Sequence, residues 1–420
     1  MKKNIWIINH YAGQMYFEKG MRHYWIAKFL KQKDYNPVVI CSNSKHNSNG
    51  ELYFDNEAIW SEHIAEDINV PFAFIRSRPY SDNGRQRILN MVDFYRNLLK
   101  CRKDLAIKYG KPDMIYASSV HPLTLVAGLK LAKSFRIRCA CEIRDLWPES
   151  LVAYGMLNRN SIIARLLYYG EKRIYKKADK VVMTWPGGYD YITDQGWSRQ
   201  ITHEKVVHIS NGVDLEEYRN NIKGYPFTDD CFSGSIMSFV YTGSVRKVNN
   251  LSMLIDAAEI LKKRDVSGYQ LLIFGDGDER ASLEEHVRQK ELTDVRFMGR
   301  VPKQQIPSVL TQADVNILHN SSSSLDKYGQ SQNKFFEYLA SGKPILMTYS
   351  VGHSIVKEKD CGIEVDRQTP EAIADAIETF IRMPKDRLKA FSENSSACVG
   401  NYDFKILTEQ VIGIIEESDQ

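Results

Sequence analysis

Residues 239–274 read FVYTGSVRKVNNLSMLIDAAEILKKRDVSGYQLLIF and contain two short apolar runs with a longer amphipathic stretch between them. The run at residues 239–243 is rich in β-branched and aromatic residues, the run at residues 270–274 is mostly aliphatic, and turn residues bound both, which is typical of buried strands. Between them, Leu251, Leu254, Ile255, Ala258 and Leu261 recur at helical spacing. This order of strand, helix and strand predicts a parallel βαβ unit.

The same alternation extends along the chain in both directions. Further strand patterns lie at residues 5–8, 37–40, 114–117, 181–183, 205–209, 295–297, 315–318 and 344–347. They predict an α/β protein with two doubly wound parallel sheets. A chain of 420 residues has the length for two domains, since one domain usually takes about 100 to 200 residues.

The domain boundaries are predicted from polarity. Residues 215–235 are polar and include Gly224, Pro226 and Gly234, so we expect a linker there. We therefore predict an N-terminal domain at residues 1–214 and a C-terminal domain at residues 236–398. Residues 399–420 carry Leu407 and Val411 among other apolar residues and are predicted to form a final helix.

The composition is that of a globular protein. Hydrophobic residues make up 43% and charged residues 26%, with no apolar run of about 18 residues and no signal peptide pattern at the start. The seven cysteines are scattered and include no pair of CxxC motifs, so neither a disulfide framework nor structural zinc is expected. We therefore expect a cytoplasmic protein.

The charge is distributed unevenly between the two halves. Residues 1–200 carry 31 Lys and Arg against 19 Asp and Glu, whereas residues 201–420 carry 25 against 33. Residues 85–111 alone hold eight cations and two aspartates, interleaved with apolar residues. Such a helix can lie on an anionic membrane surface. A helix packed on the protein with a charged outer face explains the pattern equally well.

Two loops that follow strands of the second half have the composition of phosphate-binding loops. The glycines at residues 275–277 allow a phosphate to approach the backbone at the start of a helix. The cations at residues 246–247 can neutralise a diphosphate. A tight turn without ligand and a solvated charged turn are the alternatives. The candidate ligand-binding residues here are Gly243, Arg246, Lys247, Gly275, Asp276 and Gly277.

A more specific pattern lies at residues 333–345, which read NKFFEYLASGKPI. Lys334 and Glu337 are three residues apart, so both side chains leave the same face of a helix, just after Asn333. The cation can hold a phosphate while the carboxylate accepts hydrogen bonds from vicinal hydroxyls, as in dinucleotide sites. The alternative is a surface ion pair worth at most about 0.5 kcal/mol.

In the first half, polar residues follow two neighbouring strand patterns. His121 comes after residues 114–117, and Glu142, Arg144 and Asp145 come at the end of the next run. Carboxyl ends of parallel strands share one edge of a sheet, so these groups are candidates for sugar binding or acid–base catalysis. A capping or buried histidine, favoured by Pro122 at a helix start, and an N-cap aspartate are the alternatives.

Taken together, these segments resemble a retaining glycosyltransferase of family 4 (group 1). That family has the GT-B architecture, in which two Rossmann-like doubly wound domains face each other across a cleft. The marks include Asn9-His10-Tyr11-Ala12-Gly13, Met21-Arg22-His23-Tyr24, Asn83-Gly84-Arg85, Ser118 to Pro122, Glu142 to Pro148, Asn211-Gly212-Val213-Asp214, Thr242-Gly243, Gly275-Asp276-Gly277, Gly299-Arg300-Val301-Pro302 and residues 333–345.

The chain looks most like the branch of N-acetylfucosamine transferases of bacterial O-antigen and capsule assembly. This resemblance implies a UDP-activated amino sugar as donor and a polyprenyl-diphosphate-linked saccharide as acceptor, at the inner face of the cytoplasmic membrane. It implies a peripheral membrane contact through the basic first domain and a final helix that returns to that domain.

The resemblance also implies roles for individual residues. Gly13 resembles the glycine that leaves room for the donor diphosphate, and His121 resembles the histidine beside the reacting sugar. Arg144 and Asp145 are similar to residues that face the donor or acceptor. Lys247 and Lys334 look like diphosphate ligands, Glu337 like the ribose carboxylate, and Gly277 belongs to a loop near the base.

Three positions depart from the family pattern. The family has a second glutamate eight residues before the position of Glu337, where this chain has Gly329. Its usual Arg and Lys after the Thr242-Gly243 turn are Ser244 and Asn249 here. We therefore expect Arg246 and Lys247 to substitute at the phosphates.

The expected reaction is glycosyl transfer with retention and without a metal or other cofactor, because cations and a helix N-terminus can stabilise the leaving diphosphate. A front-face displacement is implied by the family. Two alternatives stay open: a GT-B epimerase acting on a UDP-amino sugar, and a non-catalytic sugar-nucleotide-binding subunit of an assembly complex.

Overall fold

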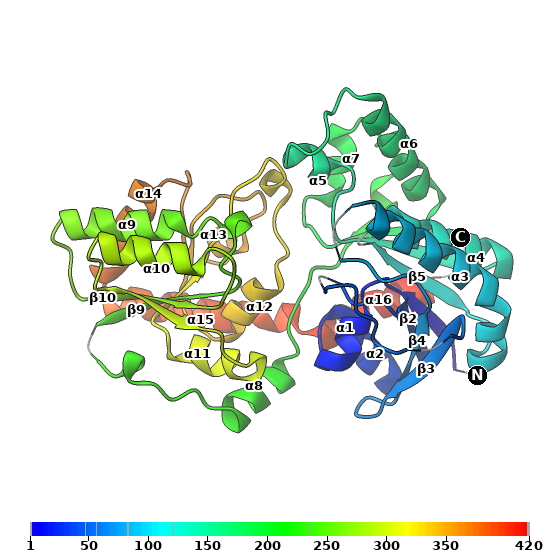
Figure 1. Ribbon diagram of the computed structural model, residues 1–420, viewed down its shortest axis with the longest axis horizontal. Coiled ribbons are helices and arrows are strands. Elements are labelled where there is room, and N and C mark those ends of the chain that lie inside the picture. Colours follow the sequence, from blue (N-terminus) through cyan, green and yellow to red (C-terminus); the bar gives the residue numbers. More distant parts are fainter. Residues whose placement is uncertain are drawn as a thin grey trace. The chain divides into compact units, whose positions relative to one another are not determined.

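The computed structural model describes residues 2–46, 48–55, 57–81, 84–119, 121–234 and 236–417 (Figure 1). Asn83 and Val120, from two of the motifs quoted above, lie outside the described residues, as do Ser235 and residues 418–420. The chain forms two compact units, one of Met1–Ser210 with Phe404–Gln420 and one of Asn211–Asp403.

The first unit is built on an eight-stranded sheet with the order β3-β4-β2-β1-β5-β6-β7-β8. All neighbouring pairs are parallel except β3 and β4, which form an antiparallel hairpin at one edge. Their short connection at residues 66–69 leaves no room for the crossover that a parallel pair needs. The strands are β1 (Asn4–Ile8), β2 (Asn36–Ser42), β3 (Trp60–Ala65), β4 (Val70–Ile75), β5 (Met114–Ser119), β6 (Arg138–Ile143), β7 (Lys180–Met183) and β8 (Val206–His208).

Helices cover both faces of this sheet. One face carries an apolar core in which Ile5, Ile7 and Tyr116 of the strands pack with Tyr24 and Leu407 of two helices. The helices are α1 (Gly13–Glu18), α2 (Arg22–Gln32), α3 (Arg85–Tyr109), α4 (Pro122–Phe135), α5 (Glu149–Ala153), α6 (Ile162–Lys177), α7 (Gly188–Asp194) and α16 (Phe404–Glu416).

The second unit has a six-stranded, wholly parallel sheet with the order β11-β10-β9-β12-β13-β14. Alternate residues of the strands pack into two separate cores, as expected when both faces of a sheet are covered. Phe239 and Leu271 lie in one core, and Val240 and Leu272 lie in the other. The strands are β9 (Met237–Thr242), β10 (Tyr269–Phe274), β11 (Val295–Gly299), β12 (Val315–Leu318), β13 (Ile345–Met347) and β14 (Gly362–Glu364).

In Figure 1, α9 and α10 lie over one face of this sheet and α8 and α11 over the other. The helix predicted at residues 251–263 is α9, and the helix expected to carry Lys334 and Glu337 is α12. Since β9 and β10 are parallel neighbours, the βαβ expectation for residues 239–274 is confirmed. The helices are α8 (Leu215–Gly224), α9 (Ser252–Lys263), α10 (Arg280–Gln289), α11 (Ile306–Gln312), α12 (Asn333–Ala340), α13 (Ile355–Glu358), α14 (Pro370–Ile381) and α15 (Lys385–Cys398).

The expected linker at residues 215–235 is folded onto the second unit. Asp214 caps α8 by accepting a hydrogen bond from the Glu217 N–H at 2.9 Å. Leu215, Tyr218 and Cys231 are buried in one of that unit's cores. The chain instead passes between the units after Ser210 and again after Asp403, and α16 packs on α2 within the first unit.

The basic helix expected at residues 85–111 is α3, and its apolar side is used by the fold. Phe94, Leu98 and Leu105 are buried, and α3 packs on α4 and β4. Most of its cations lie on the outer face of the packed helix, whereas Arg87 donates to Tyr11 Oη at 3.1 Å, so the packed-helix alternative is confirmed and the membrane contact of this segment stays a prediction. Among the described residues, no helix combines the length and the hydropathy of a membrane-spanning segment.

Candidate functional site

The most distinctive charged group of the second unit is the ammonium of Lys334, in the first turn of α12. Its Nζ atom donates a hydrogen bond to the His319 carbonyl at 3.0 Å and lies 4.7 Å from the ring centre of Tyr241. Burial lowers the pKa of Lys334 to about 7. Within the described ranges no carboxylate pairs with Lys334, so the alternative of an ion pair with Glu337 is not formed. An ammonium has three N–H groups, and two remain for a ligand.

Glu337 lies one turn further along the same helix. Its side chain is partly buried, and burial raises the pKa of its carboxyl group although the cation of Lys303 opposes the shift. No side-chain hydrogen bond to this carboxylate is formed within the described part of the chain, whereas Asn333 at the helix start is exposed. A carboxylate held this way can accept hydrogen bonds from ligand hydroxyls.

His319 orients the carbonyl that Lys334 contacts, and the sequence interpretation missed it. It directly follows β12 and is buried, with Nδ1 2.7 Å from Thr348 Oγ1 and Nε2 3.0 Å from the Asn250 carbonyl. Burial lowers the pKa of His319 to about 4, so the ring is neutral at pH 7. Its place directly after a strand pattern was the available signal.

The two glycine loops pack against each other. A Cβ atom on Gly275 would lie 1.7 Å from the Gly243 carbonyl, and one on Gly277 would lie 2.2 Å from the Val245 carbonyl. Backbone hydrogen bonds join the loops from Gly243 N to Phe274 O at 2.9 Å and from Val245 N to Asp276 O at 3.0 Å. The close approach of the two backbones therefore explains Gly275 and Gly277 without a ligand, and ligand binding there stays a prediction.

The cations of the first loop are placed at the surface. Arg246 and Lys247 are exposed, and neither forms an ion pair within the described ranges. The two positions that depart from the family pattern contact each other, because Ser244 Oγ donates to Asn249 Oδ1 at 2.8 Å. A neutral hydrogen-bonded pair therefore stands where two cations were expected from the resemblance.

Metal independence stays a prediction. The sequence Asp276-Gly277-Asp278 has the spacing of an Asp-x-Asp motif, but Asp276 accepts a hydrogen bond from the Gly277 N–H at 2.9 Å. Among the described residues, Asp256, Glu259 and His286 form the one group with metal-ligand spacing. Glu259 is already bound by the ammonium groups of two lysines, at 2.7 and 3.1 Å.

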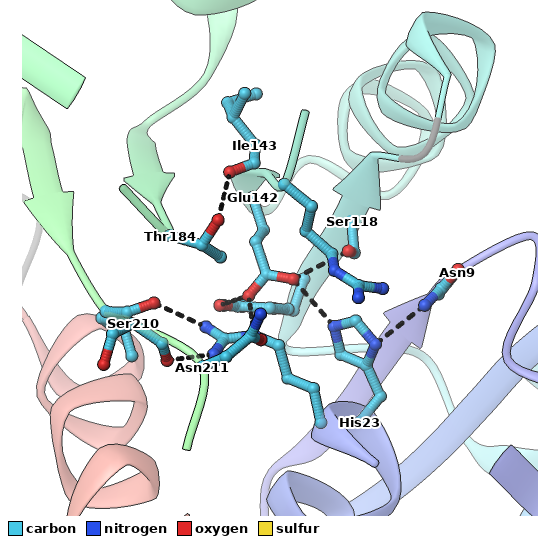
Figure 2. A network of polar contacts seen from close by, with 12 residues as sticks. Asn9, His23, Ser118, Glu142, Ile143, Thr184, Ser210 and Asn211 are labelled. Atoms are coloured by element: carbon cyan, nitrogen blue, oxygen red, sulfur yellow. Dashed lines mark hydrogen bonds and ion pairs between the residues drawn. The ribbon is translucent and has the colours of Figure 1, made fainter. Parts of the chain in front are cut away.

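In the first unit, Glu142 lies at the centre of a buried polar network (Figure 2). Its Oε2 accepts from Arg22 Nε at 2.7 Å and from Tyr116 Oη at 2.6 Å. Its Oε1 accepts from Ser118 Oγ at 2.7 Å and lies 2.9 Å from His23 Nε2. Burial alone would raise the pKa of Glu142, but Arg22 and His23 hold it well below its usual value.

This network reaches the point where the chain leaves the first unit. Arg22 also donates to the carbonyls of Ser210 and, at 3.0 Å, of Ile209, while Asn9 contacts His23 Nδ1 at 2.9 Å. Because Glu142 is wholly buried and both oxygens are engaged, it cannot reach a substrate in this arrangement. The geometry gives it a positioning role in place of the expected catalytic one.

His121 occupies the N-cap position of α4, followed by Pro122, but its side chain makes no capping hydrogen bond. It is buried, its Nε2 lies 3.3 Å from Thr124 Oγ1, and its Nδ1 has no partner in the described structure. The ring packs edge-on against His10 at 4.8 Å. Burial, assisted by the Arg87 cation, lowers the pKa of His121 to about 3. The ring is therefore a neutral imidazole with one buried nitrogen that has no hydrogen-bond partner in the described structure.

The remaining candidates of the first unit lie at the same edge of the sheet. Arg144 follows β6, with its N–H bonded to Ser119 Oγ at 3.3 Å, and Asp145 is exposed. Asp145 is not an N-cap, since α5 begins only at Glu149. Gly13 opens α1 and is buried; a Cβ atom there would lie 2.5 Å from the Tyr53 ring, so side-chain packing already explains this glycine.

Both units match models of known protein families. Residues 24–217 match the model described as Glycosyltransferase Family 4, and residues 237–383 match the model described as Glycosyl transferases group 1. The chain therefore contains a glycosyltransferase family 4 domain followed by a group 1 domain, in two α/β units of the GT-B fold.

Individual relatives are distant. The chain is 23% identical to the probable glycosyltransferase WbjE of Pseudomonas aeruginosa over 73% of this chain and 75% of that protein. It is 25% identical to the lipopolysaccharide core biosynthesis glycosyltransferase LpsE of Rhizobium meliloti, over 64% of this chain and 72% of that protein. The crystal structure of HepE of Anabaena in complex with UDP superimposes with a TM-score of 0.66 at 14% identity, covering 99% of both chains, which supports the fold.

Proposed function

We propose that this protein is a retaining glycosyltransferase that moves an N-acetylated amino sugar from a UDP-sugar to a polyprenyl-diphosphate-linked saccharide. The product belongs to a bacterial surface polysaccharide of the O-antigen or capsule type. For the donor sugar we take as the model the N-acetylfucosamine transferases, which the sequence motifs resemble.

The observation that carries the proposal is the ammonium of Lys334. Burying a charged group without an opposite charge beside it costs free energy, and proteins retain such a group where an anion binds. Glu337 leaves the same helix face with its carboxylate free of hydrogen bonds inside the described structure. A cation for the diphosphate and an acceptor for ribose hydroxyls are together what a sugar nucleotide requires.

The class of acceptor is supported by the relatives. LpsE is named for lipopolysaccharide core biosynthesis, and WbjE is named a probable glycosyltransferase. We propose the same biosynthetic role for this chain, which then acts at the inner face of the bacterial cytoplasmic membrane with a peripheral membrane contact.

In the proposed reaction, the bond between the anomeric carbon and the diphosphate oxygen breaks as the acceptor hydroxyl attacks from the same face. The acceptor proton passes to the leaving phosphate oxygen, and UDP and the extended saccharide are released. Lys334, assisted by Arg246 and Lys247, stabilises the charge that develops on the diphosphate. The family resemblance assigns His121, Arg144 and Asp145 of the first unit to the sugar; His121 is buried in this structure, so its contact with the sugar is part of the proposal.

The test has a binding step and a transfer step. UDP should raise the midpoint of thermal unfolding, whereas GDP at the same concentration should have a smaller effect; saturation at 100 times Kd corresponds to about 2.7 kcal/mol. A panel of UDP-sugars then identifies the donor. Incubation with extracted lipid-linked saccharides should add one sugar residue, measured by mass spectrometry.

Other outcomes distinguish the rivals. Conversion of the donor sugar into its epimer without any acceptor would identify an epimerase. Binding of UDP without turnover on any lipid-linked acceptor would identify a sugar-nucleotide-binding subunit. Absence of any UDP effect on unfolding would contradict the proposed function altogether.

A further inference from the structure

The outer face of α6 in the first unit exposes large apolar side chains at helical spacing. Ile162, Leu166 and Tyr169 are 76%, 65% and 60% exposed and lie on one stripe of the helix, with Ile163 beside them. Tyr154 and Met156, in the segment that leads into α6, are also exposed. We name this set the α6 patch. Figure 1 shows α6 at the periphery of its unit.

The opposite face of α6 is the one that packs on the protein. Ala164, Glu171, Ile174 and Tyr175 are buried there. The carboxylate of Glu171 accepts hydrogen bonds from Tyr175 Oη at 2.7 Å and from Tyr191 Oη of α7 at 2.8 Å. The helix therefore has an apolar inner face that also holds one carboxylate, and it exposes three large apolar residues on its outer face, where polar residues are usual. A contiguous exposed apolar patch of this kind marks an interaction surface.

The charge around the α6 patch has a single sign. Residues 154–178 contain six Lys or Arg and one acid, the buried Glu171. Arg165, Arg173, Lys176 and Lys177 are exposed, and none of them has an ion-pair partner within the described ranges. Arg159, by contrast, is held by Glu149 at 2.7 Å. The apolar first half of α6 thus adjoins a cationic second half.

We propose that the α6 patch docks the protein on a lipid bilayer that contains anionic headgroups. The apolar side chains enter the boundary between headgroups and acyl chains, Tyr154 and Tyr169 lie at the headgroup level, and the cations of the second half of α6 contact phosphates. The combination of apolar area with unpaired cations favours a bilayer over a second copy of this chain, since two copies would bring like charges together.

This surface differs from the membrane contact expected on α3. Phe94, Leu98 and Leu105 of α3 are buried in the core, and Ile88 and Ile107 of that helix are exposed singly, whereas the large apolar residues of the α6 patch are exposed together. The proposal extends the proposed function, which needs a lipid-linked acceptor and on which the purpose of the docking rests. The docking itself needs no sugar nucleotide and is measured without one.

The experiment measures cosedimentation of the full-length protein with vesicles. Vesicles of phosphatidylglycerol and phosphatidylcholine in equal parts should bind the wild-type chain at least tenfold more strongly than vesicles of phosphatidylcholine alone. The double variant Ile162→Ser, Leu166→Ser should lose at least tenfold in binding. A matched control, Ile107→Ser with Ile406→Ser, removes two exposed isoleucines elsewhere on the same unit and should bind normally.

A second pair of variants tests the contribution of the cations. Arg173→Glu with Lys176→Glu should lower binding to the anionic vesicles, whereas Arg96→Glu with Lys100→Glu on α3 should change it less. Three outcomes would each overturn the proposal. The Ile162, Leu166 double variant could bind vesicles as the wild type does, or its control could lose as much binding. The double variant could also change its oligomeric state without a change in vesicle binding. The UDP effect on thermal unfolding, recorded for every variant, reports on the second unit independently, so failure of the docking and failure of the proposed function are distinguishable.

Discussion

The ammonium of Lys334 donates to the backbone carbonyl of His319 at 3.0 Å, and this neutral oxygen is its hydrogen-bonding partner in place of a carboxylate. The charge is therefore available to an anionic ligand. We expect Lys334→Met to weaken UDP binding at least tenfold, measured by calorimetry, while the midpoint of thermal unfolding without ligand stays equal or rises. Lys343→Met is the control, because Lys343 precedes the amino end of β13, whereas Lys334 follows the carboxyl end of β12. Equal UDP affinity in both variants would remove Lys334 from the site.

The pKa of Lys334 also predicts how UDP binding depends on pH. Burial lowers this pKa to about 7 in the free protein, and a bound diphosphate raises it because the charged form is then stabilised. Binding therefore takes up a proton above pH 7, and UDP affinity should fall as pH rises from 7 to 9. The Lys334→Met variant should lack this component. A flat wild-type profile over that range would contradict the assignment.

Glu337→Gln tests the other group on α12. The substitution keeps the shape and removes the charge, so the fold should be unchanged. We expect weaker binding of UDP, with a smaller loss for uracil nucleotides that lack a ribose hydroxyl, because only the hydroxyl contacts change. Titration calorimetry with UDP and its 2′-deoxy form measures the difference. Unchanged affinity for both ligands would count against a ribose contact.

The two sheets could be predicted because the pattern of a buried strand is contained in a few consecutive residues. Apolar runs between turn residues gave β1, β9, β10 and β12. β3 was missed because its sequence, WSEHIA, is polar and lies at a sheet edge. The helix α8 was mistaken for a linker because it is polar, although Asp214 before Leu215 with two acids in the first turn is an N-cap signal.

The site residues also divide into those that local spacing predicts and those that depend on contacts between distant segments. Lys334 and Glu337 are three residues apart, so their common helix face could be predicted from spacing alone. The burial of Glu142 could not be predicted, because its partners Arg22 and His23 are 120 and 119 residues away in the chain. The packing of Gly275 against Gly243 likewise depends on two loops from neighbouring strands.

Glu142→Ala separates positioning from catalysis. The substitution leaves the guanidinium of Arg22 buried without its carboxylate, and we expect it to lower the free energy of unfolding by about 3 to 5 kcal/mol. Urea unfolding monitored by circular dichroism measures the change. The wild-type pKa of Glu142 lies below its unfolded value, so this stabilisation is present above about pH 4.5 and lost as the pH falls further. A catalytic carboxylate would instead reduce turnover with little change in stability.

His121→Ala is expected to reduce kcat at least tenfold with a smaller effect on UDP affinity, because His121 is proposed to act on the sugar and lies in the first unit, whereas the proposed diphosphate ligands lie in the second. The control is His203→Ala, which removes an exposed histidine of the same unit. Since burial keeps the pKa of His121 near 3, the ring should add no inflection to the pH profile of kcat between about pH 5 and 8. Turnover at the wild-type rate would show that this histidine is only a packing residue.

Glu171 gives the first unit a predicted pH dependence of its own. Burial raises the pKa of this carboxyl group to about 8, although the hydroxyls of Tyr175 and Tyr191 oppose the shift. The folded state then binds more protons than the unfolded state between the unfolded pKa of about 4.3 and the folded value near 8. Stability is therefore greatest below that window and falls as the pH rises through it, by at most about 1.4 kcal/mol per pH unit.

Glu171→Gln resembles the protonated carboxyl, because the amide offers one acceptor to one tyrosine hydroxyl and one donor to the other. We expect the variant to unfold at a higher urea concentration than the wild type at pH 8 and at a similar concentration at pH 5. Glu66→Gln, at an exposed position of the same unit, should leave the profile unchanged. If Glu171→Gln destabilises the protein at both pH values, the carboxyl group is charged in the fold, and the two tyrosines act as donors to an anion.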